Sequence, residues 1–285
     1  MDISVLGPCR VVQSGVSVVP TAVKPRKVLA LLALYPDQVV SVASLVEELW
    51  GESPPRSVQT TLQTYVLQLR NLIAASLGDR PPADLPNGAK SVLVTESGGY
   101  LLDTQGGMVD VSEFDRLSGA GHRALEAGDF VGASSAFRKA LELWRGPALV
   151  DVQCGPLLEI EATRLEESRL GILNQRIEVD LTLGRHHELV GELSGLAAQH
   201  PMHEGIQAQL MLALYRSGRR GNALEVYQRL RGVLSRELGL DPSPDLQRLQ
   251  CAVLDSSVEQ ELTRIAPETS FSGSGGPLRA LRGSH

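Results

Sequence analysis

Residues 57–77 read SVQTTLQTYVLQLRNLIAASL, and this stretch decides the fold of the N-terminal part of the chain. Its large apolar side chains recur at steps of four, four, three and four residues, which places them in one buried stripe of an α-helix: Val58, Leu62, Val66, Leu69 and Ile73. A rigid turn at Pro54-Pro55 precedes them. The pattern therefore predicts one long helix from Ser57 to Leu77.

The opposite face of this predicted helix is polar but has almost no acid. It contains Gln59, Thr60, Gln63, Thr64, Leu67, Gln68 and Asn71. A helix face that only meets water usually mixes Glu and Lys, whereas a surface that meets DNA avoids carboxylates because they repel phosphate. The composition favours a helix that reads DNA, and a solvated face is the alternative.

The segments before this helix predict short strands followed by two further helices. Residues 3–23 are rich in β-branched side chains and are punctuated by Gly7-Pro8 and Ser14-Gly15. Helical spacing of apolar residues then begins after Lys24-Pro25-Arg26. A second helix is predicted from Ser41 to Glu48, with the Ser41 side chain as its N-cap.

The segments after the long helix predict a loop and a hairpin. Residues 79–89 are rich in Pro, Gly and Asp. Residues 91–95 and 100–102 then form two apolar runs around Ser97-Gly98-Gly99, which indicates a β-hairpin. Strands, three helices and a closing hairpin predict a winged helix-turn-helix domain of mixed α and β structure over residues 1–104.

Every segment from about residue 112 onward has a helical pattern. Ser112-Glu113-Phe114-Asp115 resembles a capping box, and four helices are expected to end at Gly128, Gly184, Gly218 and Gly239. Residues 114–144 and 186–238 resemble neighbouring helix pairs with small residues at the crossings, as in tetratricopeptide packing. The prediction is a mainly α chain, with an all-α domain over residues 109–258 and a flexible tail over 259–285.

Bulk charge does not support nucleic-acid binding, because the net charge is −6. Residues 1–103 hold 8 Lys and Arg against 9 Asp and Glu, and the rest of the chain holds 19 against 24. A local basic patch is sufficient, however, since screening makes distant acids almost irrelevant. The three cysteines have no CxxC spacing, and no signal peptide or membrane-spanning stretch is present, so a reducing cytoplasm is expected.

Residues that suggest catalysis or metal binding have simpler explanations. His186, His187, His200 and His203 lack Cys or carboxylate neighbours at ligand spacing, and Trp50 and Trp144 are expected to be packing anchors. Ser118, Ser134 and Ser135 lack a His/Asp pattern, and no Gly-rich phosphate loop occurs. The sequence predicts no enzyme activity, no cofactor and no metal.

Dispersed blocks of residues resemble a known family. Lys24–Leu32, Val39-Val40-Ser41, Leu49-Trp50-Gly51, Leu69-Arg70 and Gly98–Leu102 look like the OmpR-type winged helix. The later half is similar to the bacterial transcriptional activation domain in Val109-Asp110-Val111, Ala140–Gly146, Arg164–Glu167, His200-Pro201, Gln209–Arg219 and Glu237–Pro242. Together, in this order, they resemble the Streptomyces antibiotic regulatory protein family over about residues 1–258.

The resemblance implies a transcriptional activator of a secondary-metabolite gene cluster. It implies binding to direct repeats near the −35 promoter element and contact with RNA polymerase holoenzyme, in the nucleoid of the cytoplasm. The sequence has no receiver domain before the winged helix and no P-loop after the helical domain, so we expect either a small family member or a shortened one. Direct repeats call for a head-to-tail dimer on DNA.

Each candidate DNA-binding residue has an expected role. The long helix would lie in the major groove, where Gln pairs with adenine and a Thr methyl group meets thymine. Basic residues at the first helix would clamp phosphate, the hairpin would reach the minor groove, and Tyr100 would be a core residue whose hydroxyl touches phosphate. For Arg70, an intramolecular ion pair and a phosphate contact are both open. The set is Lys24, Arg26, Lys27, Arg56, Gln59, Thr60, Gln63, Thr64, Gln68, Arg70, Lys90, Thr95, Ser97 and Tyr100.

Two other functions remain open. The concave surface of stacked helices could make the helical domain a receptor for a ligand or a protein, with DNA binding secondary. A repressor that occludes the promoter is a further alternative.

Overall fold

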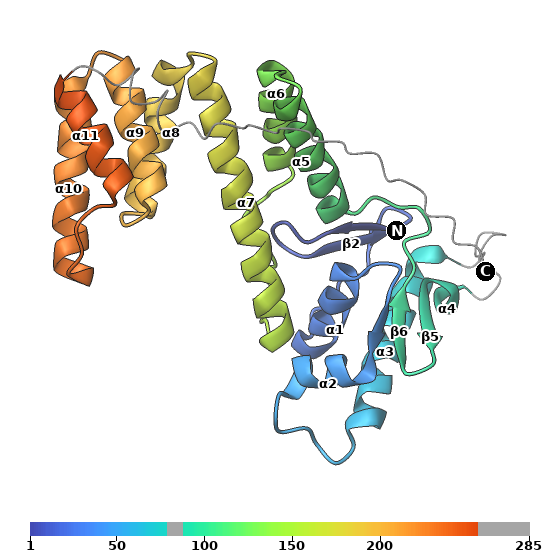
Figure 1. Ribbon diagram of the computed structural model, residues 1–285. Coiled ribbons are helices and arrows are strands. Elements are labelled where there is room, and N and C mark those ends of the chain that lie inside the picture. Colours follow the sequence, from blue (N-terminus) through green and yellow to red (C-terminus); the bar gives the residue numbers. More distant parts are fainter. Residues whose placement is uncertain (79–87, 256–285) are drawn as a thin grey trace, which may run out of the picture. The chain divides into compact units, whose positions relative to one another are not determined.

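A computed structural model describes residues 1–78 and 88–255 of the chain (Figure 1). They form two compact units, Met1–Gly184 and a second unit that begins at Arg185. The predicted tail and most of the loop predicted at 79–89 lie outside the described residues.

The first unit begins with an antiparallel sheet in the order β1-β2-β3, formed by Asp2–Ser4, Arg10–Gln13 and Val16–Ser17. The helices α1 (Val23–Leu34), α2 (Val42–Trp50) and α3 (Val58–Leu77) follow. A second sheet has the order β4-β6-β5, from Val39–Ser41, Gly99–Leu102 and Leu93–Glu96. This arrangement is a winged helix-turn-helix, as predicted.

Local signals account for most of these boundaries. The Ser44 amide donates to Ser41 Oγ at 3.0 Å, which confirms Ser41 as the N-cap of α2. The hairpin prediction is wrong at its start, because Ser91 and Val92 belong to a short helix, α4 (Ala89–Val92), and the strand begins at Leu93.

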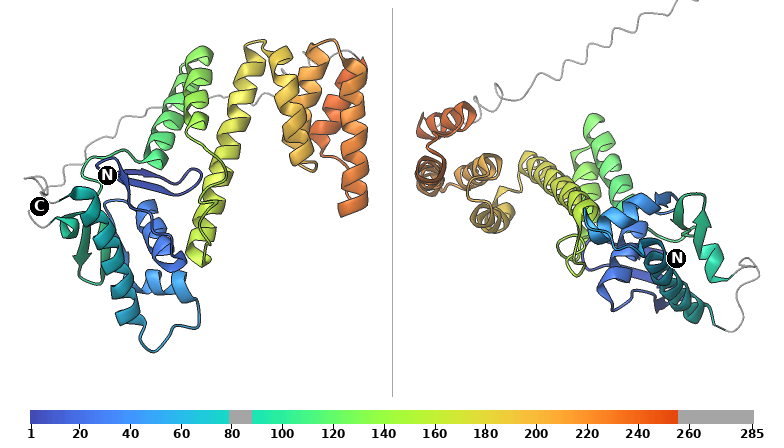
Figure 2. Two further views of the ribbon diagram at one scale, coloured as in Figure 1. Left: turned by 180° about the vertical axis from the view of Figure 1, so that it is seen from behind. Right: turned by 90° about the horizontal axis from the view of Figure 1, so that it is seen from below.

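Three helices complete the first unit: α5 (Asp110–Glu126), α6 (Phe130–Glu142) and α7 (Pro156–Thr182). The β1–β3 sheet lies between the winged-helix helices and the α5–α6 pair (Figures 1 and 2). The capping box predicted at Ser112–Asp115 is wrong, because α5 starts two residues before Ser112 and its N-cap is Val109.

The second unit contains α8 (His186–Gln199), α9 (Glu204–Arg216), α10 (Arg220–Leu238) and α11 (Pro244–Asp255). Helix α9 packs against both α8 and α10, so the predicted pair over 186–238 is a set of three antiparallel helices. Positive φ angles between +68° and +77° confirm the predicted helix ends at Gly128, Gly184, Gly218 and Gly239.

The division between the two units falls later than the domain boundary predicted at residues 104–109. The core of the winged helix includes Leu149, Val152 and Leu158, which lie in the segment before α7 and in its first turn. Apolar burial therefore joins α7 and the segment before it to the winged helix.

Candidate nucleic-acid interface

Helix α3 presents the predicted polar face to solvent. Its exposed side chains are Gln59, Thr60, Gln63, Thr64, Leu67, Gln68 and Asn71, and the opposite stripe of Leu62, Val66, Leu69 and Ile73 is buried. No Asp or Glu occurs anywhere in the helix. The structure thus places a carboxylate-free surface where phosphate could approach it.

Hydrogen bonds within α3 determine what this face offers. Thr64 Oγ1 donates to the Thr60 carbonyl at 2.9 Å, so its hydroxyl proton is used by the helix and its oxygen lone pairs remain. Within residues 1–78 and 88–255, the side-chain amides of Gln59, Gln63 and Gln68 have no hydrogen-bond partner. These amides can each donate and accept toward a ligand.

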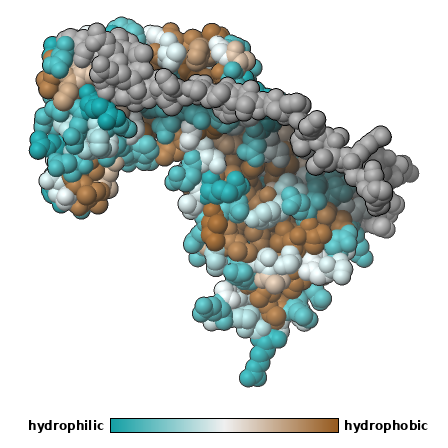
Figure 3. Space-filling model, viewed as in Figure 1, coloured by the Kyte–Doolittle hydropathy of each residue, from teal (hydrophilic) through white to brown (hydrophobic). Residues whose placement is uncertain are grey.

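The loop before α3, residues 51–57, carries the exposed Arg56 to the start of the helix. This loop forms the hydrophilic tip at the bottom of the space-filling view in Figure 3. Ser57 makes no side-chain cap bond to α3. The Val58 amide donates to the Pro55 carbonyl at 3.1 Å, which leaves the amides of Gln59 and Thr60 in the first turn near the Arg56 charge, and this suits an anion such as phosphate.

The wing consists of β5, β6 and the exposed turn at Ser97 and Gly98. Gly99 must be glycine, because a Cβ atom there would lie 2.2 Å from the Val40 carbonyl oxygen of β4. Lys90 and Ser97 are exposed, but Glu96 is also exposed and puts a carboxylate beside the turn. The wing therefore offers polar contacts with little positive charge.

Arg70 is turned from α3 toward the wing. Its Nε and Nη2 donate to the Leu93 carbonyl at 3.0 and 2.8 Å, and Nη2 also donates to Thr95 Oγ1 at 2.7 Å. Of the two roles left open for Arg70, the structure shows an intramolecular one, made of hydrogen bonds and not of an ion pair. Tyr100 is 8% exposed and packs in the core.

The predicted basic cluster at the start of α1 is divided. The Lys24 ammonium lies 4.8 Å from the centre of the Trp50 ring, which itself stacks on Tyr65 at 6.3 Å. Lys27 is half-buried near Cys154: burial raises the pKa of that thiol, and the Lys27 charge lowers it in part. Lys24 therefore contacts a side chain of α2, whereas Lys27 lies near the segment before α7.

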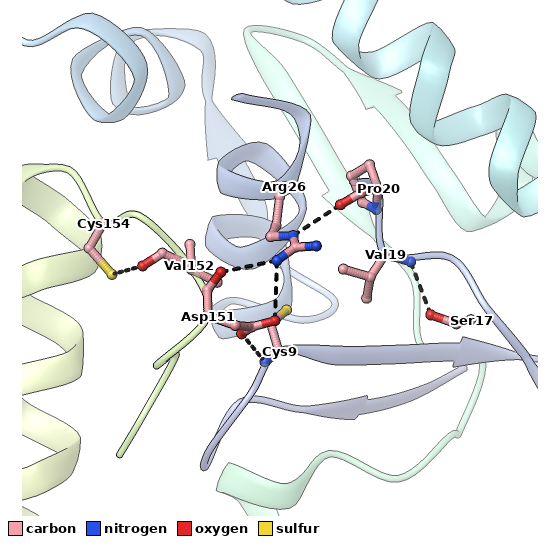
Figure 4. A network of polar contacts seen from close by, with 8 residues as sticks. All are labelled: Cys9, Ser17, Val19, Pro20, Arg26, Asp151, Val152 and Cys154. Atoms are coloured by element: carbon pink, nitrogen blue, oxygen red, sulfur yellow. Dashed lines mark hydrogen bonds and ion pairs between the residues drawn. The ribbon is translucent and has the colours of Figure 1, made fainter. Parts of the chain in front are cut away.

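Arg26 does not fit the predicted phosphate clamp. Its guanidinium donates to the carbonyls of Pro20 and Asp151, both at 3.0 Å, and its Nη1 lies 3.3 Å from Asp151 Oδ2 (Figure 4). The other oxygen of this carboxylate accepts from the Cys9 amide at 2.6 Å. Arg26 is therefore engaged by the segment before α7, which local sequence did not indicate.

Two buried acids have structural roles that the sequence did not indicate. Glu48 is 2% exposed and accepts from the amides of Gly155, Leu157 and Leu158 at the start of α7, at 2.5, 3.0 and 3.0 Å. Asp110 accepts from the amides of Val5 and Leu6, both at 3.0 Å. Nothing in the neighbouring sequence marks either residue, because their partners lie about a hundred positions away.

The other residues considered for chemistry are accounted for by packing. Trp144 is buried and meets Phe114 edge to face at 5.7 Å, so it is a packing anchor as predicted. The described residues hold no cluster of His, Cys, Asp and Glu placed to bind a metal ion. In that same part of the chain, none of the helices has both the length and the apolar character needed to cross a membrane.

Comparison with known proteins relates this architecture to transcriptional regulators. The bacterial transcriptional activator domain matches residues 109–254, and the C-terminal domain of transcriptional regulatory proteins matches residues 17–83. The regulatory protein DnrI of Streptomyces peucetius is 51% identical over 94% of this chain and 96% of its own length. The regulatory protein AfsR of Streptomyces coelicolor is 38% identical over 93% of this chain, which spans 25% of AfsR.

A solved structure agrees with the fold. Mycobacterium tuberculosis EmbR, in complex with a low-affinity phosphopeptide, is 31% identical and superposes with a TM-score of 0.78 over 92% of this chain and 68% of its own. The chain therefore belongs to the Streptomyces antibiotic regulatory protein family of transcriptional activators, which join an OmpR-type winged helix to a bacterial transcriptional activator domain.

Proposed function

We propose that this activator binds direct repeats near the −35 element of promoters in a secondary-metabolite gene cluster and recruits RNA polymerase holoenzyme there. The observation that carries the proposal is the exposed, carboxylate-free face of α3, whose three glutamine amides have no partner among the residues that the structure describes. A helix with this face fits the major groove, because amides can pair with base edges and nothing on it repels phosphate.

Each residue of the interface has a role in this proposal. Gln59, Gln63 and Gln68 read adenine edges, and Thr60 and Thr64 turn methyl groups toward thymine. Arg56 binds phosphate at the start of α3 and Lys24 binds phosphate at the start of α1, and Lys90 and Ser97 reach the minor groove. A good bidentate amide–adenine pair is worth about 1–3 kcal/mol of discrimination against the wrong base.

Two copies would bind head to tail, since direct repeats have no two-fold axis between them. Cooperative binding to a two-repeat promoter, compared with a promoter that has one repeat removed, tests this arrangement. Transcription in vitro with purified holoenzyme separates activator from repressor. Transcript levels that fall on adding the protein would exclude recruitment.

The first test is a salt series on promoter DNA with wild type and the double variant Gln63→Ala/Thr64→Ala. We expect specific affinity to fall at least tenfold. Non-specific binding should stay unchanged, and so should the salt slope, which is the slope of the logarithm of affinity against the logarithm of salt concentration, because no cation is lost. Gln228→Ala, an exposed glutamine of α10, is the matched control and should bind as wild type does. Unchanged specificity in the double variant would remove α3 from base reading.

Ligand sensing by the second unit is a second candidate function. A groove of about 390 Å³ runs between α8 and α10 over Leu210 and Leu214, with Val226, Leu230 and the charged Arg229 along one wall. Its size lies in the range of small-molecule sites, roughly 300–1,000 Å³. A rise in melting temperature with a metabolite of the controlled pathway would support it, and no shift with any of them would count against it.

A further inference from the structure

Arg70 is the only charged residue of α3. It lies two turns after Gln63 on the same side of the helix, but its side chain is half-buried and bonds to the wing. Its fork of donors makes three hydrogen bonds to the first strand of the wing, two to the Leu93 carbonyl and one to Thr95 Oγ1. Hydrogen bonds from a guanidinium are charge-assisted and directional. Arg70 therefore ties the wing to α3 at a defined distance.

The position of the wing strand makes this link important. In the sheet order β4-β6-β5, strand β5 is the outer one, and β6 lies between it and β4. The tip of the wing consists of Glu96, the last residue of β5, and the turn at Ser97 and Gly98 that follows it. A contact at Leu93 and Thr95 thus sets where the tip lies relative to the exposed face of α3.

We infer that Arg70 is a positioning residue for DNA reading: it does not bind DNA but holds the wing so that α3 and the wing engage adjacent grooves together. This inference rests on the proposed function. Lysine cannot replace arginine in the role, because a single ammonium group lacks the planar fork that reaches two acceptors. In this role the Thr95 hydroxyl oxygen accepts a hydrogen bond from Arg70, and its main role is this contact and not a contact with DNA.

The salt dependence of binding separates this role from a phosphate contact. Residues 93–102 of the wing contain no Lys or Arg, and Lys90 lies in α4, before the strand that Arg70 holds. A loosened wing tip therefore removes no phosphate neutralisation. If Arg70 only positions the wing, Arg70→Lys and Arg70→Gln both lower affinity and both keep the salt slope. If Arg70 binds phosphate, Arg70→Lys keeps the affinity, and Arg70→Gln reduces the slope by about 0.9.

The experiment uses the full chain with promoter DNA. We expect each Arg70 variant to bind about tenfold more weakly, at an unchanged slope. Hydroxyl-radical protection of the flanking minor groove should be lost, while protection of guanine N7 in the major groove remains. Arg123→Lys, an exposed arginine of α5, is the control and should match wild type. Loss of both protections together, or wild-type affinity in Arg70→Lys, would overturn the inference.

Hydrogen exchange on the free protein tests the link without DNA. The amides of residues 93–96 should exchange faster in both Arg70 variants and in Thr95→Val, which keeps the side-chain shape and removes the acceptor. If these amides exchange as slowly in the variants as in the wild type, the inference is overturned, even when the wild-type protein binds promoter DNA as proposed. Failure of the wild type to bind promoter DNA would instead refute the proposed function, so the two failures are distinguishable. Thr95→Val also carries the test if an Arg70 variant does not fold.

Discussion

At the scale of single residues, burial sets the chemistry of Cys9. The side chain is 6% exposed, and burial, aided by the nearby Asp151 carboxylate, raises the pKa of its thiol to about 12. A thiolate is the reactive form of cysteine, so this thiol is inert near neutral pH. Cys251 is exposed on α11 and has no such protection.

Alkylation with iodoacetamide at pH 8 should therefore label Cys251 in the native protein and leave Cys9 unlabelled until the chain unfolds. Because the pKa of Cys9 in the folded state lies above the ordinary thiol value of 9.0, the stability linked to this group is present below pH 9 and is lost as the pH rises toward 12. Mass spectrometry of the labelled peptides shows which of the two thiols, Cys251 or Cys9, is alkylated first. Equal labelling rates for the two thiols in the native state would contradict the burial argument.

At the scale of elements, Glu48 joins α2 to α7. Its carboxylate accepts hydrogen bonds from three backbone amides at the N-terminus of α7. The first amides of a helix lack partners within the helix, and the helix dipole favours negative charge at this end. The carboxylate thus takes the place of a local N-cap for α7, whose own N-cap residue is Gly155.

Glu48→Gln should lower the free energy of unfolding by about 2 kcal/mol, because the glutamine NH₂ group would face amide donors in a buried site. Urea denaturation followed by circular dichroism measures the change. Glu47→Gln, the exposed neighbour on the same helix, is the matched control and should change stability by less than about 0.5 kcal/mol. Equal stabilities for the two variants would show that the bonds to α7 contribute nothing.

At the scale of the whole molecule, the winged helix is not an independent body within the described residues. The Leu149 amide donates to the Val5 carbonyl at 3.1 Å and the Arg145 amide donates to the Leu6 carbonyl at 2.9 Å. The hydrogen bonds of Glu48 to the start of α7 and of Arg26 to Asp151 add to these two. These contacts join the segment before α7 to the N-terminal sheet. All of these contacts lie within the compact unit Met1–Gly184.

A fragment of residues 1–184 should therefore unfold in one cooperative transition, whereas residues 1–104 should be less stable by several kcal/mol. The shorter fragment loses the apolar cover of Leu149, Val152 and Leu158, and each buried aliphatic side chain contributes roughly 1.5–3 kcal/mol. Thermal and urea unfolding of the two fragments gives the comparison. A 1–104 fragment as stable as 1–184 would refute the cooperative unit.

The sequence by itself determined the features that depend on residues close together in the chain. The helical spacing of Leu62, Val66 and Leu69 defined the buried side of α3, and the same spacing placed the glutamines on the exposed side. Ser41 and the glycines with positive φ marked helix ends. These signals are local because a helix repeats every 3.6 residues and its caps act within one turn.

Tertiary packing alone decides the partners of Arg26, Glu48 and Arg70. Arg26 bonds to Asp151 across 125 positions, Glu48 to Gly155 across 107, and Arg70 to Leu93 across 23. Such partners are chosen by which elements pack together, and a buried charge takes whichever donors or acceptors that packing brings within reach. Periodicity along the chain carries no record of that choice, so the predicted basic cluster at α1 became a link between the winged helix and the segment before α7.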